Sequence, residues 1–201
     1  MDELLLAAHE GEVVERSFEG CDLSGQDLER LELTACTLSH CSLAGARIGR
    51  IDLSQCELVE CDLAGLVARR GYWGRTQLRD CRATGADLSE SYFRDTRFIG
   101  GNFAYLNLSY GKLERVAFED VRLSEAILSS VRLVGGLGLS NCDLSAAECI
   151  GTRLRNVDLS SCEIAGLRVG DRFAELQGAR IAYDQAIDLV GLLGVRITDA
   201  S

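Results

Sequence analysis

The sequence predicts an all-β solenoid that winds in square coils of about twenty residues and ends in a short helix. Three observations predict this fold. From Phe18 to Leu133 an apolar residue stands at nearly every fifth position, and the series resumes at Leu139 after a one-residue slip at residues 135–136. Glycine often stands two places after that apolar residue, where a turn needs a positive φ. The chain contains no proline, which suits backbone ladders along every wall.

A period of five residues matches neither the two-residue alternation of a strand nor the 3.6-residue turn of a helix. It is typical of repeat proteins whose units are too small to bury an apolar face alone. We call the large apolar residue of each unit its centre. The residue two places before it is also small or apolar, as at Cys21, Leu31 and Ala46. The sequence contains 31 such units, which predicts nearly eight coils.

Four segments resemble the A(D/N)LXX motif of the pentapeptide-repeat family: CDLSG (21–25), CDLAG (61–65), GADLSE (85–90) and NCDLSAA (141–147). The resemblance extends over roughly residues 16 to 171 and implies the fold of that family, a right-handed quadrilateral β-helix of pentapeptide repeats. We therefore expect an N-terminal cap over residues 1–15 and the β-helix over residues 16–171. A C-terminal cap and dimerisation segment is expected over residues 172–201.

All nine cysteines are expected to point into the coil as small hydrophobic side chains. No CxxC pair is present, and His9 and His40 stand apart from any cluster of ligands, so the sequence predicts no metal site and no cofactor. Free buried thiols are typical of a reducing compartment, which predicts a cytoplasmic protein. No apolar run is long enough to cross a membrane, and the acidic N-terminus does not resemble a secretory signal.

Trp73 is larger than the other centres. The small centres Ala68 and Ala83 are expected to give up the volume that the indole takes. A ligand-stacking role for Trp73 is the less favoured alternative. Residues 66–75 form the least regular stretch of the repeat, and the sequence leaves open whether this stretch bulges outward and exposes Arg69 and its neighbours.

The formal net charge of −10 is distributed unevenly over the four expected walls. Numbered from the wall of Phe18, the walls carry net charges of −4, −3, 0 and +3 over residues 16–171. Acidic walls keep a rod soluble. They also offer a strip of negative charge to a protein surface built for nucleic acid, whereas direct nucleic acid binding is not expected because phosphates are repelled. The candidate partner-binding residues are Asp22, Glu57, Glu60, Asp62, Glu119, Glu125, Asp143, Asp158 and Glu163.

The five-residue period stops after Asp171, and helical spacing follows in the C-terminal segment. Asp184, Gln185 and Asp188 mark the polar side of the expected helix, and residues 195–198 alternate like a short strand. A helix with a wide apolar surface can cap the solenoid and also meet a second copy, usually about a two-fold axis. The alternative is a cap on a monomer. The expected dimerisation residues are Tyr183, Ile187, Val190 and Leu193.

Residues 81–93, 107–120 and 178–195 are similar to segments of the Qnr, MfpA and AlbG group of pentapeptide-repeat proteins. The resemblance implies a homodimeric DNA mimic that binds DNA gyrase, and in some cases topoisomerase IV. Such proteins inhibit the topoisomerase or protect it from quinolones and other poisons, a form of antibiotic resistance. The loops that project from the larger Qnr proteins are missing from this sequence, so the resemblance implies binding more strongly than protection.

A cytoplasmic scaffold that binds another protein partner is the alternative function. An enzyme is not expected. No Ser–His or Cys–His pair stands in register, no phosphate-binding loop is present, and a filled interior leaves no substrate cavity. The sequence therefore predicts no catalytic residue and an outer surface that carries the function.

Overall fold

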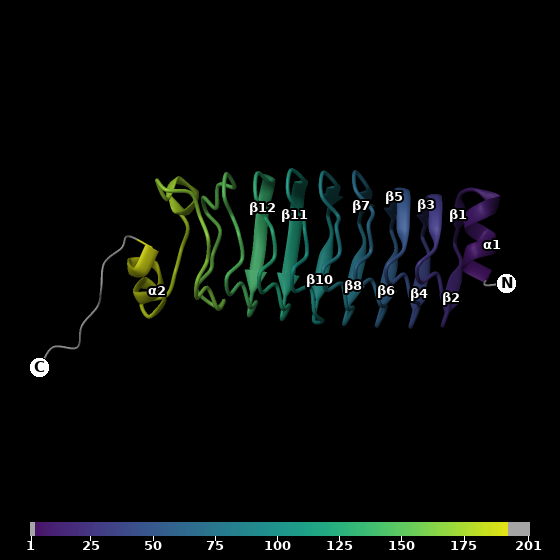
Figure 1. The fold of residues 1–201 in the computed structure, drawn as a ribbon, viewed down its shortest axis with the longest axis horizontal. Helices are drawn as coiled ribbons and strands as arrows, with labels where there is room; N and C mark the ends of the chain where they lie inside the picture. The colour runs from purple at the N-terminus through teal and green to yellow at the C-terminus, as the bar shows by residue number, and fades with distance from the viewer. Residues whose placement is uncertain (1–2, 193–201) are drawn as a thin grey trace, which may run out of the picture.

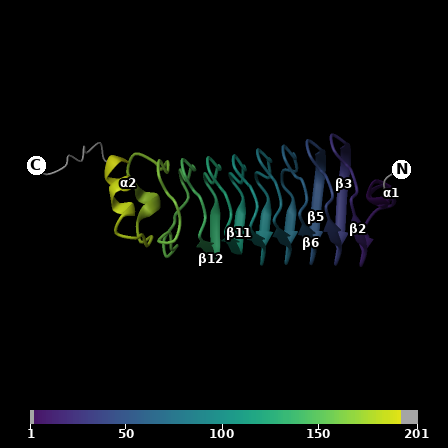
Figure 2. The same ribbon diagram turned by 90° about the horizontal axis from the view of Figure 1, so that it is seen from below.

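The computed structural model describes residues 3–192, which form a rod of stacked coils with a helix at each end (Figure 1). The view turned by 90° shows the same stack from another side, again with α1 and α2 at opposite ends (Figure 2). In chain order the elements are α1 (Glu3–Glu10), β1 (Val13–Val14), β2 (Ser17–Glu19), β3 (Asp27–Thr34), β4 (Thr37–Ser39), β5 (Arg47–Ser54), β6 (Glu57–Val59), β7 (Tyr72–Gly74), β8 (Gln77–Arg79), β9 (Tyr92–Arg94), β10 (Arg97–Ile99), β11 (Lys112–Glu119), β12 (Arg132–Ser140), η1 (Ala174–Leu176) and α2 (Gln185–Leu192).

Four parallel ladders run along the rod, and each joins a residue to the one twenty positions later, or 21 past residues 135–136. The first wall is the ladder through Phe18, made by β2, β4, β6, β8, β10 and the second half of β11. The fourth wall is the ladder through Leu33, made by β1, β3, β5, β7, β9, β11 and β12. Single bridges form most of the second wall, which includes Asp22, and of the third wall, which includes Val67.

This parallel β-solenoid with a short C-terminal helix confirms the predicted fold class. The solenoid has about six turns, fewer than the eight coils that the count of units predicts. The two numbers differ because, beyond β12, the ladders consist of single bridges rather than strands, as between Asp158 and Arg180. The inward residues of this last part, including Leu154 and Leu159, are still buried. The hydrophobic column therefore continues further than the strands do.

The centres form one continuous hydrophobic core along the axis of the rod. Aromatic rings fill its middle part, where Phe98 stacks on Phe118 with ring centroids 4.4 Å apart. Trp73 is fully buried and stacks on Phe93 at 5.5 Å, so its ring is not available to stack on a ligand. A Cβ atom at Gly71 would lie 3.1 Å from the indole Nε1 and would collide with Ile51. The absence of a side chain at Gly71 therefore makes room for the indole, a contribution that the sequence analysis did not foresee.

Residues 66–75 do not bulge. Val67 pairs with Arg47 on one side and with Asp87 on the other, and Tyr72 pairs with Asp52 and Tyr92 in the same register. The register of the fourth wall shifts elsewhere, in the pairing of β11 with β12, where the sequence has its one-residue slip. The sequence of residues 66–75 is irregular because it includes the large Trp73, but its backbone keeps the five-residue repeat.

Many corners of the coil are turned by a left-handed residue two places after the centre. At Gly20 and Gly65, φ is +63° and +64°, as the sequence predicts. Arg75 and Tyr110 adopt the same conformation with φ of +53° and +59°. Such a conformation costs an L-residue about 1 kcal/mol, so the ladders and the core stabilise corners that lack glycine.

All nine cysteines are free and buried, as expected. Six of these thiols donate weak hydrogen bonds to backbone carbonyls of the preceding coil, as Cys56 Sγ does to Leu33 O at 3.3 Å. Burial raises the pKa of Cys56 to about 11 and that of Cys149 to about 12, so both thiols stay protonated at neutral pH. Residues 3–192 contain no group of three or more candidate metal ligands. None of the helices in that range is long and apolar enough to cross a bilayer.

The two ends of the core are covered in different ways. At the N-terminal end, α1 buries Leu4 and Ala7. At the C-terminal end, the placement of Gln185 on the polar side of the helix is wrong, because its side chain is only 7% exposed. Its amide nitrogen donates to Leu159 O at 2.8 Å and to Cys162 O, two carbonyls of the last coil. Leu159 O also accepts the backbone N–H of Cys162 at 2.9 Å, and no further coil follows within residues 3–192 to supply a donor to Cys162 O, so the amide takes that place. The strand predicted for residues 195–198 lies outside the described residues.

We predict that Gln185→Leu lowers the free energy of unfolding by about 2 kcal/mol, because buried carbonyls lose their donor. Denaturant unfolding followed by circular dichroism measures the change. Gln26→Leu makes the same substitution at an exposed position and should shift the free energy by less than about 0.5 kcal/mol. Equal effects of the two substitutions would show that the Gln185 amide does not close the end of the solenoid.

Candidate functional site

The nine acidic candidates lie on the outer faces of the first and second walls, and each is exposed or half-buried. Six of them stand directly before a centre and Glu119 stands directly after one, so they point outward because neighbouring residues of a strand point to opposite faces. Glu60 and Glu125 stand at corners, with φ of +50° and +58°. The acidic residues do not form continuous rows along these walls, however. The outward row of the second wall reads, coil by coil, Asp22, Ser42, Asp62, Arg82, Asn102, Arg122, Asp143 and Glu163. Two arginines therefore stand within the acidic row.

Five of the nine carboxylates contact an arginine of a neighbouring coil. Arg82 contacts Asp62 through two nitrogens, with Nε to Oδ1 at 3.1 Å, and lowers the pKa of Asp62. The other four pairs are Glu57 with Arg79 at 2.8 Å, Glu119 with Arg97 at 2.6 Å, Asp143 with Arg122 at 3.7 Å, and Asp158 with Arg180 at 3.2 Å. The sequence analysis missed these pairs, although their spacing of 20 to 22 residues is visible in the sequence.

The remaining carboxylates bind neutral groups or histidine. Asp22 accepts the backbone N–H of Ser24 at 2.9 Å, and hydrogen bonding from Ser24 lowers the pKa of Asp22. Glu163 accepts the N–H of Ala165 at 3.0 Å. The two other contacts are Glu125 with the Tyr105 hydroxyl at 2.7 Å and Glu60 with the His40 ring at 3.6 Å. Local bonds of this kind hold Glu163 and Glu125 on the surface without neutralising them.

The cross-coil ion pairs are solvent-exposed, and such pairs contribute only about 0 to 1 kcal/mol each. Arg82 and Arg122, for example, each expose 61% of their side chains. A cationic partner surface could therefore displace these arginines at little cost. The first and second walls also keep their negative net charge, because acids outnumber arginines on both.

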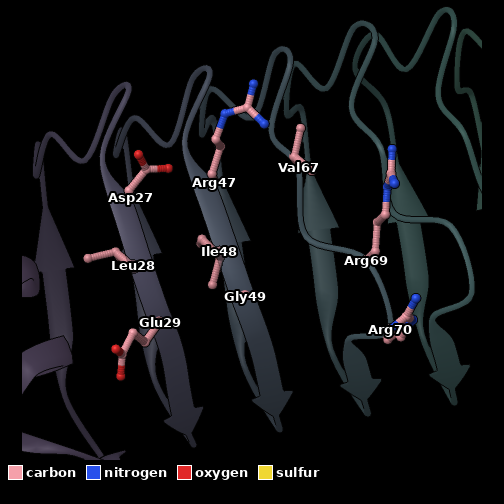
Figure 3. Close-up of a pocket in the computed structure, with 9 residues that line it drawn as sticks. All are labelled: Asp27, Leu28, Glu29, Arg47, Ile48, Gly49, Val67, Arg69 and Arg70. Atoms are coloured by element: carbon pink, nitrogen blue, oxygen red, sulfur yellow. The ribbon is translucent and has the colours of Figure 1, made fainter.

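An open groove of about 770 Å³ lies on the third wall (Figure 3). Asp27, Arg47 and Val67 line it on three successive coils, and Gly49 leaves part of its floor without a side chain. Arg69, also in the lining, is paired with Asp87 at 2.6 Å. The lining residues include no histidine, cysteine or serine, so this groove holds no Ser–His or Cys–His pair.

The C-terminal end of the described chain presents several exposed apolar side chains, including the most exposed one, Tyr183. Tyr183 is 96% exposed and Ile187 is 59% exposed, and Ile181 lies near them in the sequence at 36%. Val190 is half-buried. Leu193, the fourth expected dimerisation residue, lies outside the described residues.

Square coils, a continuous hydrophobic core and charged outer walls define this solenoid. A family model of pentapeptide repeats matches residues 17–55, 76–109 and 139–168 in eight copies. These segments make up just over half of the chain, and the chain belongs to the pentapeptide-repeat family. A comparison with curated protein sequences finds no match.

Several solved structures are similar to the chain. QnrB1, a plasmid-mediated fluoroquinolone resistance protein, is 23% identical with a TM-score of 0.43, and the match covers 94% of this chain and 92% of QnrB1. HetL, a pentapeptide-repeat protein involved in the regulation of heterocyst differentiation in the cyanobacterium Nostoc sp. strain PCC 7120, is 21% identical with a TM-score of 0.45, and the match covers 90% of this chain and 94% of HetL. Rfr23 from the cyanobacterium Cyanothece 51142 is 15% identical with a TM-score of 0.32, and the match covers 89% of this chain and 97% of Rfr23.

Proposed function

We propose that the protein is a non-catalytic cytoplasmic binding protein whose partner is DNA gyrase, with topoisomerase IV as a second target. In this proposal its acidic walls occupy the surface on which the topoisomerase holds DNA. Binding there excludes DNA and inhibits the enzyme, or protects it from quinolone-type poisons that act on the enzyme–DNA complex.

The observation that carries this proposal is the negative net charge of two adjacent walls, whose outward carboxylates stand in rows along the rod. Coils follow one another at about 4.8 Å, so the charges lie on a rigid lattice rather than on flexible loops. DNA offers a comparable array of fixed negative charges. Hydrogen bonding lowers the pKa values of Asp22 and Asp158, chiefly through Ser24 and Ser160, and favours their charged form at neutral pH.

One observation favours a scaffold for a different protein partner. Arginines pair with five of the nine candidate carboxylates, which leaves a surface of mixed charge rather than a continuous anion. A partner with alternating acidic and basic groups fits such a surface as well as a DNA-binding groove does. The two proposals differ in which substitutions abolish binding.

The test is a DNA supercoiling assay with purified gyrase, the wild-type protein and charge variants. We expect Asp143→Lys with Glu163→Lys to raise the concentration for half-inhibition at least tenfold, because a cationic partner surface is then repelled. The matched control, Asp27→Lys with Glu29→Lys, makes the same charge change on the third wall and should alter that concentration less than about threefold.

Wild-type protein that leaves supercoiling unchanged at micromolar concentration would overturn gyrase binding and leave the scaffold. Equal effects of the two double variants would overturn the assignment to the second wall. Reactions with ciprofloxacin separate the two outcomes of binding: less cleaved DNA in the presence of the protein indicates protection, and unchanged cleavage with reduced supercoiling indicates inhibition alone.

We also propose that the C-terminal segment joins two copies through Tyr183, Ile187, Val190 and Leu193. We predict that Ile187→Asp converts the dimer to a monomer of 21.8 kDa in light scattering at micromolar protein concentration in 300 mM NaCl. A charge desolvated in an apolar contact costs several kcal/mol. Ile150→Asp, at a side chain 44% exposed on the side of the rod, should leave the mass unchanged. A dimer that survives Ile187→Asp but not Ile150→Asp would place the interface elsewhere.

A further inference from the structure

The proposals of gyrase binding, of a scaffold and of a C-terminal dimer do not involve the outward row of residues on the fourth wall. Coil by coil it reads Glu32, Asp52, Tyr72, Tyr92, Lys112 and Arg132, and each residue pairs in register with the next. We call these six residues the fourth-wall row. It runs from acidic through aromatic to basic along five coil steps, a length of about 24 Å.

The acidic end of the row is open to further contacts because its ion pairs are long and their arginines are exposed. The Glu32 carboxylate pairs with Arg50 at 3.6 Å and with Arg30 at 3.9 Å, and these arginine side chains are 67% and 54% exposed. Asp52 receives a long hydrogen bond from the Ser54 hydroxyl at 3.4 Å, and burial raises its pKa. Exposed ion pairs are weak, so a cation brought by another molecule can replace Arg30 or Arg50 beside these carboxylates.

The basic end of the row is open in the same way. Arg132 is exposed and forms no ion pair with any residue in the described range 3–192. A groove of about 380 Å³ lies beside it, lined also by Arg153 of the next coil and by Gly151. Lys112 is partly neutralised, because it contacts Glu114 at 2.8 Å and lies 4.1 Å from the centre of the Tyr92 ring.

The middle of the row is a half-buried aromatic platform. The rings of Tyr72 and Tyr92 lie 5.6 Å apart. A Cβ atom at Gly74 would collide with the Tyr72 ring, so the ring lies across its own strand where another residue would project. The platform therefore offers apolar ring surface between the two charged ends.

We propose that the fourth wall is a self-association surface on which a second copy of this chain docks with its long axis antiparallel. A two-fold axis between the coils of Tyr72 and Tyr92 places Glu32 opposite the partner's Arg132. The same axis places Asp52 opposite the partner's Lys112, and Tyr72 opposite the partner's Tyr92. Every charge of the row then meets its opposite, and the contact is isologous, as a closed dimer requires.

The order of charges along the fourth-wall row favours a second copy of the chain in the antiparallel orientation. A parallel arrangement sets Glu32 against the partner's Glu32 and Arg132 against the partner's Arg132, which is unfavourable at both ends. A shift by one coil replaces ion pairs with contacts between charged and aromatic residues. The second wall lies opposite the fourth in the coil, so this contact leaves the second wall free for the partner proposed above.

The test is sedimentation equilibrium of the full chain carrying Ile187→Asp, which removes the proposed C-terminal contact. We expect association that weakens as NaCl rises from 50 to 300 mM, since exposed charge pairs are screened. Arg132→Glu and Glu32→Arg should each weaken it at least tenfold. The double variant with both substitutions exchanges the two charges and should restore association to within about threefold of the Ile187→Asp parent.

Arg47→Glu is the matched control, because Arg47 is also exposed and without an ion pair among residues 3–192, but lies on the third wall. It should leave association unchanged. A parent that stays monomeric at 0.5 mM protein in low salt overturns the proposal. So does association that survives both single reversals, or a double variant that is not restored although its circular dichroism is unchanged. None of these results depends on whether the protein binds gyrase.

Discussion

The constraint on which the whole structure depends is that two residues in every five point into a coil of fixed circumference. Trp73 fits this interior because Gly71 has no side chain. Parallel ladders with a twenty-residue register then stack the coils. Since the centres are buried in one continuous core, the charged side chains stand at outward positions, and these positions form straight rows along the rod.

Because the outward residues stand in rows, the net charge of each wall is not enough to describe the surface. Residues twenty apart become neighbours at about 4.8 Å, which is the distance at which charges and rings interact. The second wall has a negative total, yet Arg82 stands next to Asp62, and the pair shares two nitrogen–oxygen contacts. The fourth wall has a positive total, yet its row begins with Glu32. The order within a row, rather than its sum, decides what can dock on it.

The fold was predictable because a five-residue period leaves few other architectures, and the same period placed the cysteines and the left-handed corners at Gly20 and Gly65. The features that sequence reasoning missed are those that break the period or connect coils. Gln185 looked polar and solvent-facing, but an end coil has carbonyls without a following strand, and a buried amide satisfies them. The cross-coil pairs require comparison at a spacing of 20 to 22 residues, which sorting by wall does not provide.

A rigid rod cannot reshape itself around a partner, so its selectivity must come from the match between two fixed patterns of charge. A partner that offers only cations would have to displace Arg82 and Arg122 from the second wall before it meets the carboxylates beneath. Exposed ion pairs are weak enough for that exchange. A row that contains both signs and an aromatic centre is matched instead by an incoming surface that carries the same pattern reversed, and the pairs exchanged there, such as Glu32 with Arg50, are long. A two-fold axis reverses the order of residues in any row. A second copy of the chain therefore always presents the reversed pattern of the fourth-wall row.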